Sequence, residues 1–316
     1  MKTLPCNFLM RADGVGRGVE RWLSGARGLR RERYDLAVDF TGLFHSAAAA
    51  RATGAPVRVG FRRRVVLGHF RAEGFSHFYT HEFPPAEGLH VAQEMNLLAA
   101  ALGARADDGG WEMGQDPRAR IEAERVLARA GIDPEEGPLV VVHPSAKWPP
   151  KRWPAAGFAE TIDILQGRGW RALVNFGPGE EKILEGLRGA CRTSPVFLWP
   201  PVPLETLGAL LEKADVFVGN DSGPMHMAAA MGTPVVAIFG PTQPDRCRPK
   251  GSPFTAFYAA LECSPCQLYF TRERCRRGHN YCMDGFRPSS VAAAVELAAD
   301  RRKRQRRPSG LSSPAP

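Results

Sequence analysis

Short apolar runs alternate with segments of helical periodicity along the second half of the chain. Apolar runs without interruption are typical of strands that a parallel sheet buries on both faces. The predicted strands are Leu139–His143, Trp170–Phe176, Val216–Val218 and Pro234–Phe239. The predicted helices are Arg118–Ala130, Ala155–Gln166, Pro203–Glu212, Met225–Met231 and Pro288–Arg302. This alternation predicts a parallel sheet with right-handed crossovers, whose ligands lie at the carboxyl ends of the strands.

The first half carries fewer elements of this kind. Tyr34–Phe40 is predicted to form a buried strand, which the loop Thr41-Gly42 joins to a helix at Phe44–Ala52. The segment Gly18–Leu29 is predicted to be helical, and His90–Leu102 has the spacing of an amphipathic helix.

Turn-forming residues suggest where the chain divides. Gly109-Gly110 and Asp116-Pro117 are typical of a linker. We therefore predict an N-terminal domain at 1–115 and a second domain at 116–300. The remainder, 301–316, is a basic segment with the composition of a disordered tail.

Composition narrows the class of protein. The chain has 316 residues, of which 44% are hydrophobic and 24% charged, as in an ordinary globular protein. The net charge is +9, but the tail supplies six basic residues and no acidic one. Such a run is usually a solvated end, although it also suits contact with anionic lipid or nucleic acid. No aromatic-and-basic motif supports nucleic-acid binding. The apolar run of a membrane span and the apolar core of a signal peptide are missing, so we expect a cytoplasmic protein.

The stretch Ala214–Thr242 holds the strongest candidate site. A polar loop, Asn220-Asp221-Ser222-Gly223, lies between a buried strand and a helix, and His226 falls in the first helical turn. Free N–H groups and the positive end of the helix dipole make such a loop suitable for phosphate. The alternative is structural: Asp221 and Ser222 cap the helix and His226 packs against the sheet.

This stretch resembles a known signature. Asp221-Ser222-Gly223-Pro224-Met225-His226, followed by Gly232-Thr233-Pro234 and Phe239-Gly240-Pro241-Thr242, is similar to the motif of glycosyltransferase family 9, the bacterial heptosyltransferases. The resemblance implies an α/β fold of GT-B type, with two Rossmann-like domains facing a cleft. It also implies transfer of heptose from ADP-heptose to the anionic lipopolysaccharide inner core, with inversion and without a metal or cofactor. Peripheral contact with the inner membrane surface is compatible with that acceptor, and no nucleic-acid partner is implied.

The resemblance extends to two further loops. The segment Pro144–Pro154 is similar to the family's donor loop, which implies that Ser145 hydrogen-bonds the diphosphate and Lys151 neutralises it. With Asp221, Ser222, Gly223 and His226 they would form the donor site. An acidic residue after the strand Trp170–Phe176 would hold the nucleoside; we choose Glu180, with Glu181 as the neighbouring alternative. Taken alone, Lys151 is an ordinary surface lysine and Glu180 a residue favoured by a helix dipole.

The N-terminal domain departs from the family pattern. A first strand with a Gly-Asp loop, which supplies the family's proposed base, is not found, and Asp13 does not replace it. We therefore expect an incomplete N-terminal domain and a second possible function, a truncated non-catalytic nucleotide-sugar-binding remnant. Asp39, at the end of a predicted strand, is our candidate base, and capping of the next helix is its alternative role. A basic stretch is either a solvated face or a lip of the acceptor cleft; its members are Arg58, Arg62, Arg63, Arg64 and Arg71.

Four of the seven cysteines cluster as Cys263-x2-Cys266-x8-Cys275-x6-Cys282. This spacing permits a zinc or iron–sulfur site, which would have a structural role. The alternative is a loop of buried or free thiols.

Overall fold

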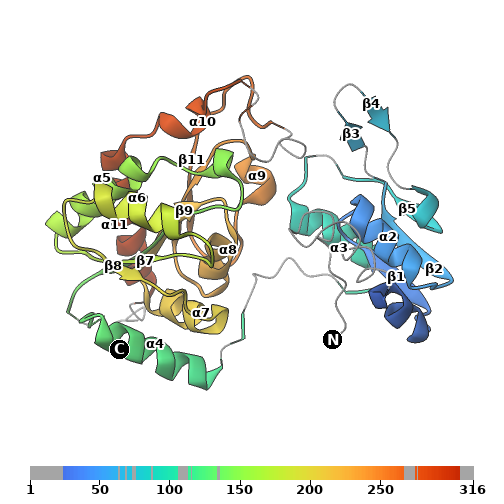
Figure 1. The fold of residues 1–316 in the computed structure, drawn as a ribbon, viewed down its shortest axis with the longest axis horizontal. Coiled ribbons are helices and arrows are strands. Elements are labelled where there is room, and N and C mark those ends of the chain that lie inside the picture. Colours follow the sequence, from blue (N-terminus) through green and yellow to red (C-terminus); the bar gives the residue numbers. More distant parts are fainter. Residues whose placement is uncertain are drawn as a thin grey trace, which may run out of the picture. The chain divides into compact units, whose positions relative to one another are not determined.

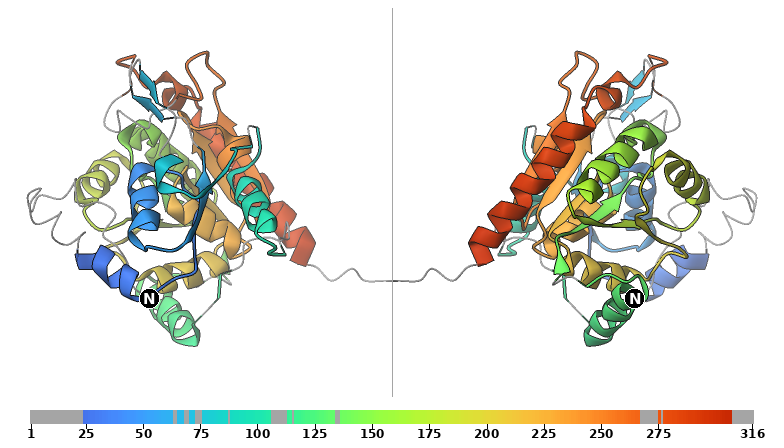
Figure 2. Two further views of the ribbon diagram at one scale, coloured as in Figure 1. Left: turned by 90° about the vertical axis from the view of Figure 1, so that its right-hand side faces the viewer. Right: turned by 90° about the vertical axis from the view of Figure 1, so that its left-hand side faces the viewer.

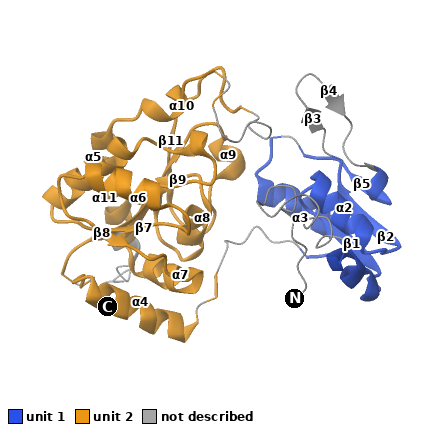
Figure 3. Cartoon of the chain, in the orientation of Figure 1, with its two compact units in different colours: residues 1–107 blue, residues 108–316 orange. Residues whose placement is uncertain are grey.

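A computed structural model of the chain describes residues 24–62, 65–67, 70–72, 76–86, 88–105, 113–114, 116–133, 136–266, 275 and 277–306. The chain forms two compact units, residues 1–107 and 108–316 (Figure 3). The sequence placed the boundary near residue 115. The two units are described separately below.

A six-stranded sheet forms the centre of the second unit. Its strands lie in the order β11-β10-β9-β6-β7-β8, and every neighbouring pair is parallel. Their bounds are β6 Leu139–His143, β7 Arg171–Asn175, β8 Val196–Leu198, β9 Val216–Asn220, β10 Val235–Phe239 and β11 Phe254–Tyr258. The chain runs outward from β6 to β8 and then returns to place β9 on the other side of β6. The predicted parallel sheet is confirmed, and its order reverses between β6 and β9.

Helices cover both faces of this sheet (Figures 1 and 2). The side chains of Val140 and Val142 pack on one face with helices α5 (Ala155–Gly167), α6 (Glu181–Ala190) and α11 (Pro288–Arg306). Leu139 and Val141 point to the other face, which α4 (Pro117–Arg129), α7 (Leu204–Lys213) and α8 (Gly223–Ala230) cover. Because successive side chains of a strand alternate between faces, one apolar run supplies both halves of the core. Two short helices, α9 (Pro244–Cys247) and α10 (Tyr281–Asp284), complete the unit.

The last helix continues past the predicted start of the disordered tail. Helix α11 extends to Arg306, whereas the tail was expected to begin at residue 301. Arg302 is buried and donates hydrogen bonds to the carbonyl oxygens of Ala214 and Glu212, so this part of the helix is held against the second unit. Residues 307–316 lie outside the described residues.

The first unit has a smaller sheet. Strands β1 (Leu36–Asp39), β2 (Val57–Phe61) and β5 (His81–Phe83) are parallel and lie in the order β1-β2-β5. Helices α2 (Phe44–Ala52) and α3 (Val91–Ala101) match the predicted ones closely. The remaining elements are an antiparallel pair, β3 (Val65–Leu67) and β4 (Phe70–Ala72), and a 3₁₀ turn at Ser76–Phe78.

Strand β1 is not the buried strand that its apolar sequence predicted. Leu36 is 44% exposed, and of the four residues only Asp39 is buried. In the described part of the unit β1 lies at the edge of the sheet, which explains the exposure. Residues 1–23, including Asp13, lie outside the described residues, and the expected incompleteness of the domain stays a prediction. A helical segment at 24–31 overlaps the predicted one.

None of the helices in the described ranges combines the length and the apolar composition needed to cross a membrane.

Candidate functional site

The carboxyl ends of β6 and β9 bring two predicted loops together. In a doubly wound sheet, ligands bind where the strand order reverses, and here that point lies between these two strands. Asn220, buried at the end of β9, accepts a hydrogen bond from the Trp153 backbone N–H (3.0 Å) and donates through Nδ2 to the Pro144 carbonyl oxygen (2.9 Å). Its side chain therefore holds the loop that follows β6.

Close contact between the two strands depends on a glycine. A Cβ atom at Gly219 would lie 2.9 Å from the carbonyl oxygen of His143 and 2.9 Å from the ring of Phe217. A larger residue would push β9 away from β6 at the point where the two loops meet.

Lys151 and Asp221, which the sequence assigned to one site, are in direct contact. Lys151 Nζ lies 2.5 Å from Asp221 Oδ2, and the two side chains are 16% and 8% exposed. The same carboxylate oxygen accepts a hydrogen bond from Thr242 Oγ1 at 2.6 Å. Lys151 ends a 3₁₀ turn, and its ammonium lies 5.1 Å from the centre of the Trp148 ring, a cation–π contact. A cation is thus fixed at the edge of the sheet by a carboxylate and an aromatic ring.

Ser145 and Glu180 form a second pair beside the first. Ser145 Oγ donates to Glu180 Oε1 at 2.5 Å, and the Gly177 backbone N–H donates to Glu180 Oε2 at 2.7 Å. The Ser145 carbonyl oxygen also accepts a hydrogen bond from Asn220 Nδ2 (3.4 Å), so Asn220 links both pairs. Glu180 is the residue before helix α6, whereas Glu181 is exposed in its first turn. The structure therefore brings Glu180, and not Glu181, into contact with a predicted donor-loop residue.

A neutral histidine lies beneath these loops. His143 is 5% exposed, and its Nδ1 lies 3.1 Å from the carbonyl oxygen of Asn175. Burial lowers the pKa of His143, and this outweighs the nearby Glu180 carboxylate, which raises it. Because a carbonyl oxygen only accepts, the neutral ring must carry its proton on Nδ1.

Helix α8 presents its N-terminus next to Asp221. Ser222 is the N-cap residue, yet its hydroxyl makes no capping hydrogen bond and, among the described residues, has no hydrogen-bond partner although it is buried. A Cβ atom at Gly223 would meet no heavy atom within 4 Å, so there is open space at the first residue of the helix. His226 lies one turn further and is half-buried. The predicted capping role of Ser222 is not seen in these contacts.

Asp39, the candidate base, is in the first unit and makes structural contacts. It is 5% exposed and accepts hydrogen bonds from Tyr79 Oη (2.6 Å) and from the backbone N–H groups of Thr41 (2.8 Å) and Gly42 (3.1 Å). Both carboxylate oxygens are therefore occupied. These contacts favour a structural role, but not the helix cap that the sequence suggested: the N-cap of α2 is Leu43, and Asp39 instead fixes the loop Thr41-Gly42 before it.

The basic stretch is only partly described. Arg58 donates to the carbonyl oxygens of Phe78 (2.8 Å) and Ala55 (2.5 Å), so its guanidinium is committed to the backbone. Arg62 is exposed, Arg63 and Arg64 lie outside the described residues, and Arg71 is described only as part of strand β4.

Sequence reasoning did not assign a role to Asn220 or Thr242. Asn220 is the last residue of β9 and Thr242 lies in the loop after β10, so their positions at the carboxyl ends of buried strands could have indicated a role. Their partners, however, are 67 and 21 residues away in the chain, and such contacts become visible only in the folded chain.

A parallel doubly wound sheet with charged and hydroxyl groups at its carboxyl edge defines a Rossmann-like α/β protein. The model of the family described as "Glycosyltransferase family 9 (heptosyltransferase)" matches residues 22–276. The chain therefore belongs to glycosyltransferase family 9, and the predicted family membership is confirmed.

Curated relatives agree with this family. The chain is 30% identical over 234 residues to lipopolysaccharide heptosyltransferase 3 of Escherichia coli, a match that covers 73% of this chain and 66% of that protein. It is 28% identical over 246 residues to lipopolysaccharide heptosyltransferase 1 of Pseudomonas aeruginosa, covering 78% and 65%. The chain thus spans about two thirds of the length of the curated relatives that it matches.

Solved structures support the predicted fold class. The family 9 glycosyltransferase of Veillonella parvula superposes with a TM-score of 0.70 at 19% identity, covering 88% of this chain and 79% of that one. The E. coli ADP-heptose heptosyltransferase II superposes with a TM-score of 0.65 at 20% identity, covering 89% and 81%. The fold is accordingly α/β, of the GT-B type of these heptosyltransferases.

Proposed function

We propose that this protein transfers heptose from ADP-heptose to the inner core of lipopolysaccharide, with inversion at the anomeric carbon and without a metal ion. The observation that carries the proposal is the Lys151–Asp221–Thr242 contact at the point where the order of the sheet reverses. Two relatives support the donor: one solved heptosyltransferase is an ADP-heptose enzyme, and another, WaaC of E. coli, was solved with ADP.

The donor diphosphate would bind between Lys151 and the N-terminus of α8. Lys151 supplies a positive charge. The Ser222 hydroxyl, which has no hydrogen-bond partner in the described part of the chain, and the open space at Gly223 offer a hydrogen bond and room for a phosphate oxygen. Helix N-termini favour such anions. His226, in the first turn, is the further donor-site residue that we infer from the family motif.

The structure supports different roles for the two carboxylates. A carboxylate repels a diphosphate, so we assign Asp221 to holding Lys151 and Thr242 in place, not to direct contact with phosphate. Glu180 holds Ser145, whose hydroxyl is oriented toward it at 2.5 Å. In the donor complex we expect Glu180 to contact the nucleoside and Ser145 the diphosphate.

Transfer requires one bond to form and one to break. The acceptor hydroxyl oxygen bonds to the anomeric carbon, the bond from that carbon to the diphosphate breaks, and ADP leaves with the electron pair. Lys151 and the α8 amides stabilise the charge that grows on ADP, and groups already in place for that charge lower the barrier. A base takes the acceptor proton. Asp39 is the candidate that the sequence offered for this step.

Substitution of Lys151 tests the donor site. Lys151→Ala should weaken ADP binding by about 1.5–3 kcal/mol, the usual value of a charge-assisted contact, measured by titration calorimetry. Lys147→Ala is the matched control, since this exposed lysine belongs to the same loop and its loss changes the net charge equally. Equal ADP affinity of Lys151→Ala and the wild type would remove the donor-site assignment.

A second measurement separates the enzyme from the non-catalytic remnant. Wild-type protein is incubated with ADP-heptose and heptose-deficient lipopolysaccharide, and ADP release and sugar incorporation are followed. An enzyme produces both. ADP binding without ADP release would favour the binding protein.

A further inference from the structure

A carboxylate and an aromatic ring hold the ammonium of Lys151 at the carboxyl edge of the sheet. Lys151 Nζ lies 2.5 Å from Asp221 Oδ2 and 5.1 Å from the centre of the Trp148 ring. A carboxylate this close offsets most of the positive charge that a more distant ligand would feel. In the protein without ligand, the Lys151–Asp221 pair therefore attracts a diphosphate less than a single lysine would.

Binding of a diphosphate changes the balance between these contacts. An ammonium has three N–H donors, so Lys151 can be shared between Asp221 and a phosphate oxygen. The diphosphate and Asp221 are both negative and repel each other, which favours a longer distance from Lys151 to Asp221 once the ligand is bound. A further partner without charge would hold the ammonium in the site during this exchange.

Trp148 has the properties of such a partner. The face of a tryptophan ring attracts a cation within about 6 Å of its centre, and does so more strongly than the ring of tyrosine or phenylalanine. Because the ring has no net charge, it attracts the ammonium without offsetting the charge that the diphosphate feels. Trp148 is half-buried and the Lys151 side chain is 16% exposed, and partial shielding from water strengthens a contact of this kind.

A short turn of the backbone fixes the ring and the ammonium relative to each other. Trp148 precedes the 3₁₀ turn Pro149–Lys151, and its carbonyl oxygen accepts a hydrogen bond from the Lys151 backbone N–H at 2.9 Å. Pro149 and Pro150, the first two residues of the turn, each have a φ angle that the proline ring restricts. The two side chains therefore extend from a rigid part of the loop, and little further ordering is needed when ADP binds.

We propose that Trp148 is a positioning residue of the donor site. Its ring keeps the Lys151 ammonium in place while a phosphate oxygen of the nucleoside diphosphate shares that ammonium with Asp221. Trp148 acts through Lys151 and does not touch the nucleotide. This inference rests on the proposed function, because it deepens the assignment of the donor site. It predicts that Trp148 contributes to ADP binding only when Lys151 is present.

A double-mutant cycle of Trp148 and Lys151 tests this inference, with ADP affinity measured by titration calorimetry. In the wild-type background, Trp148→Leu should weaken ADP binding about three- to thirtyfold, the range expected for loss of a cation–π contact. Trp148→Phe keeps an aromatic face and should recover most of this loss. In the Lys151→Ala background, Trp148→Leu should change the affinity by less than about twofold, because the ring then has no ammonium to hold. Where binding is too weak for calorimetry, the rise in melting temperature with millimolar ADP gives the same comparison.

A structural role, or stacking of the ring on adenine, gives a different result. In either case Trp148→Leu weakens ADP binding equally in both backgrounds, and equal losses would overturn the inference. Trp148→Gln, which has no aromatic face, replaces Trp148→Leu if that variant is unfolded. Wild-type ADP affinity in Lys151→Ala would overturn the donor site together with this inference. A weakened Lys151→Ala beside a Trp148→Leu that binds like the wild type would overturn the inference and leave the donor site intact.

Discussion

A buried ion pair fixes the position of the lysine ammonium in the candidate donor site before any ligand binds. Lys151 and Asp221 are both largely withdrawn from water, and Thr242 donates to the same carboxylate. Removing one partner of such a pair leaves the other charge uncompensated, which costs more than the pair contributes. We therefore expect Asp221 to be the group that holds the Lys151 side chain in position.

Gly223 offers a test that separates ligand contact from folding. Its Cβ would meet open space, so Gly223→Ala should change the free energy of unfolding by less than about 1 kcal/mol. The added methyl group would occupy space that we assign to a phosphate oxygen, and ADP affinity should fall at least tenfold by calorimetry. Gly186→Ala is the control, because a Cβ at this exposed position in α6 also meets open space. If Gly223→Ala binds ADP like the wild type, the diphosphate does not approach the start of α8.

His143 should make stability depend on pH. Burial lowers its pKa in the folded protein. Between the lowered pKa and the ordinary value of 6.5, the unfolded chain therefore binds a proton on this ring and the folded chain does not. The stability contributed by the neutral ring is fully present above the ordinary pKa of 6.5 and is lost as the pH falls from there through the folded-state value. Urea unfolding of the wild type and His143→Gln between pH 7.5 and 5 measures this. The wild type should lose more stability than the variant, and equal slopes would contradict the assignment.

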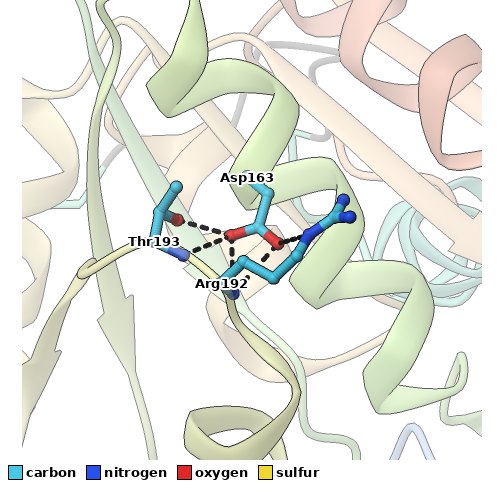
Figure 4. Close-up of polar contacts among 3 residues, drawn as sticks. All are labelled: Asp163, Arg192 and Thr193. Atoms are coloured by element: carbon cyan, nitrogen blue, oxygen red, sulfur yellow. Dashed lines mark hydrogen bonds and ion pairs between the residues drawn. The ribbon is translucent and has the colours of Figure 1, made fainter.

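At the scale of elements, one carboxylate joins helix α5 to the chain that follows α6. Asp163 accepts hydrogen bonds from Thr193 Oγ1 (2.5 Å) and from the backbone N–H groups of Thr193 (2.8 Å) and Arg192 (3.1 Å) (Figure 4). Arg192 Nε adds an ion pair at 3.3 Å. Burial raises the pKa of Asp163, but these hydrogen bonds outweigh it and the net pKa is lowered. The same two elements are also joined by a hydrogen bond from Gln166 Nε2 to the Ser194 carbonyl oxygen (3.5 Å).

Asp163→Asn should therefore destabilise the second unit. We expect a loss of about 1–3 kcal/mol in the free energy of unfolding at pH 7, because the amide cannot satisfy all of these donors. The lost contribution is present in the wild type above the ordinary pKa of 3.8 and disappears as the pH falls through the lower folded-state value. Glu160→Gln, an equal charge change at an exposed position of the same helix, should have little effect. Similar denaturation midpoints for both variants would show that the network contributes nothing.

A comparison of predicted and observed strands shows which parts of the fold the sequence pattern can predict. The predicted bounds of strand β6 match the observed ones at both ends. All five of its residues are buried, and an apolar run in the sequence is typical of a strand buried in this way. Strands β8 and β11, which were not predicted, lie at the two edges of the sheet and are only partly buried. Strand β8 is an apolar run of only three residues, and the apolar run of β11 is interrupted by Thr255. The grouping of Lys151 with Asp221 was predictable because both follow buried strands. The contact of Asp221 with Thr242, and the hydrogen bonds of Asn220 to the loop after β6, depend on side-chain geometry that sequence spacing does not encode.

At the scale of the whole molecule, the two units are unequally built. The second unit has two extended apolar clusters on opposite faces of its sheet, whereas the described part of the first unit has two small ones. In the described part of the first unit, buried polar contacts such as those of Asp39 add to these clusters.

Asp39→Asn decides between a base and a structural residue. If Asp39 is a structural residue, the substitution should lower the free energy of unfolding by about 1–2 kcal/mol, while kcat at fixed protein concentration falls less than tenfold. We expect this outcome, because three hydrogen bonds already occupy the carboxylate. Tyr79→Phe is the matched control: it removes the 2.6 Å bond to Asp39 but leaves the carboxylate, so it should destabilise the protein similarly. A general base contributes about 10²–10⁴-fold to the rate. A fall of that size in Asp39→Asn, with Tyr79→Phe still active and both variants equally folded, would assign the acceptor proton to Asp39.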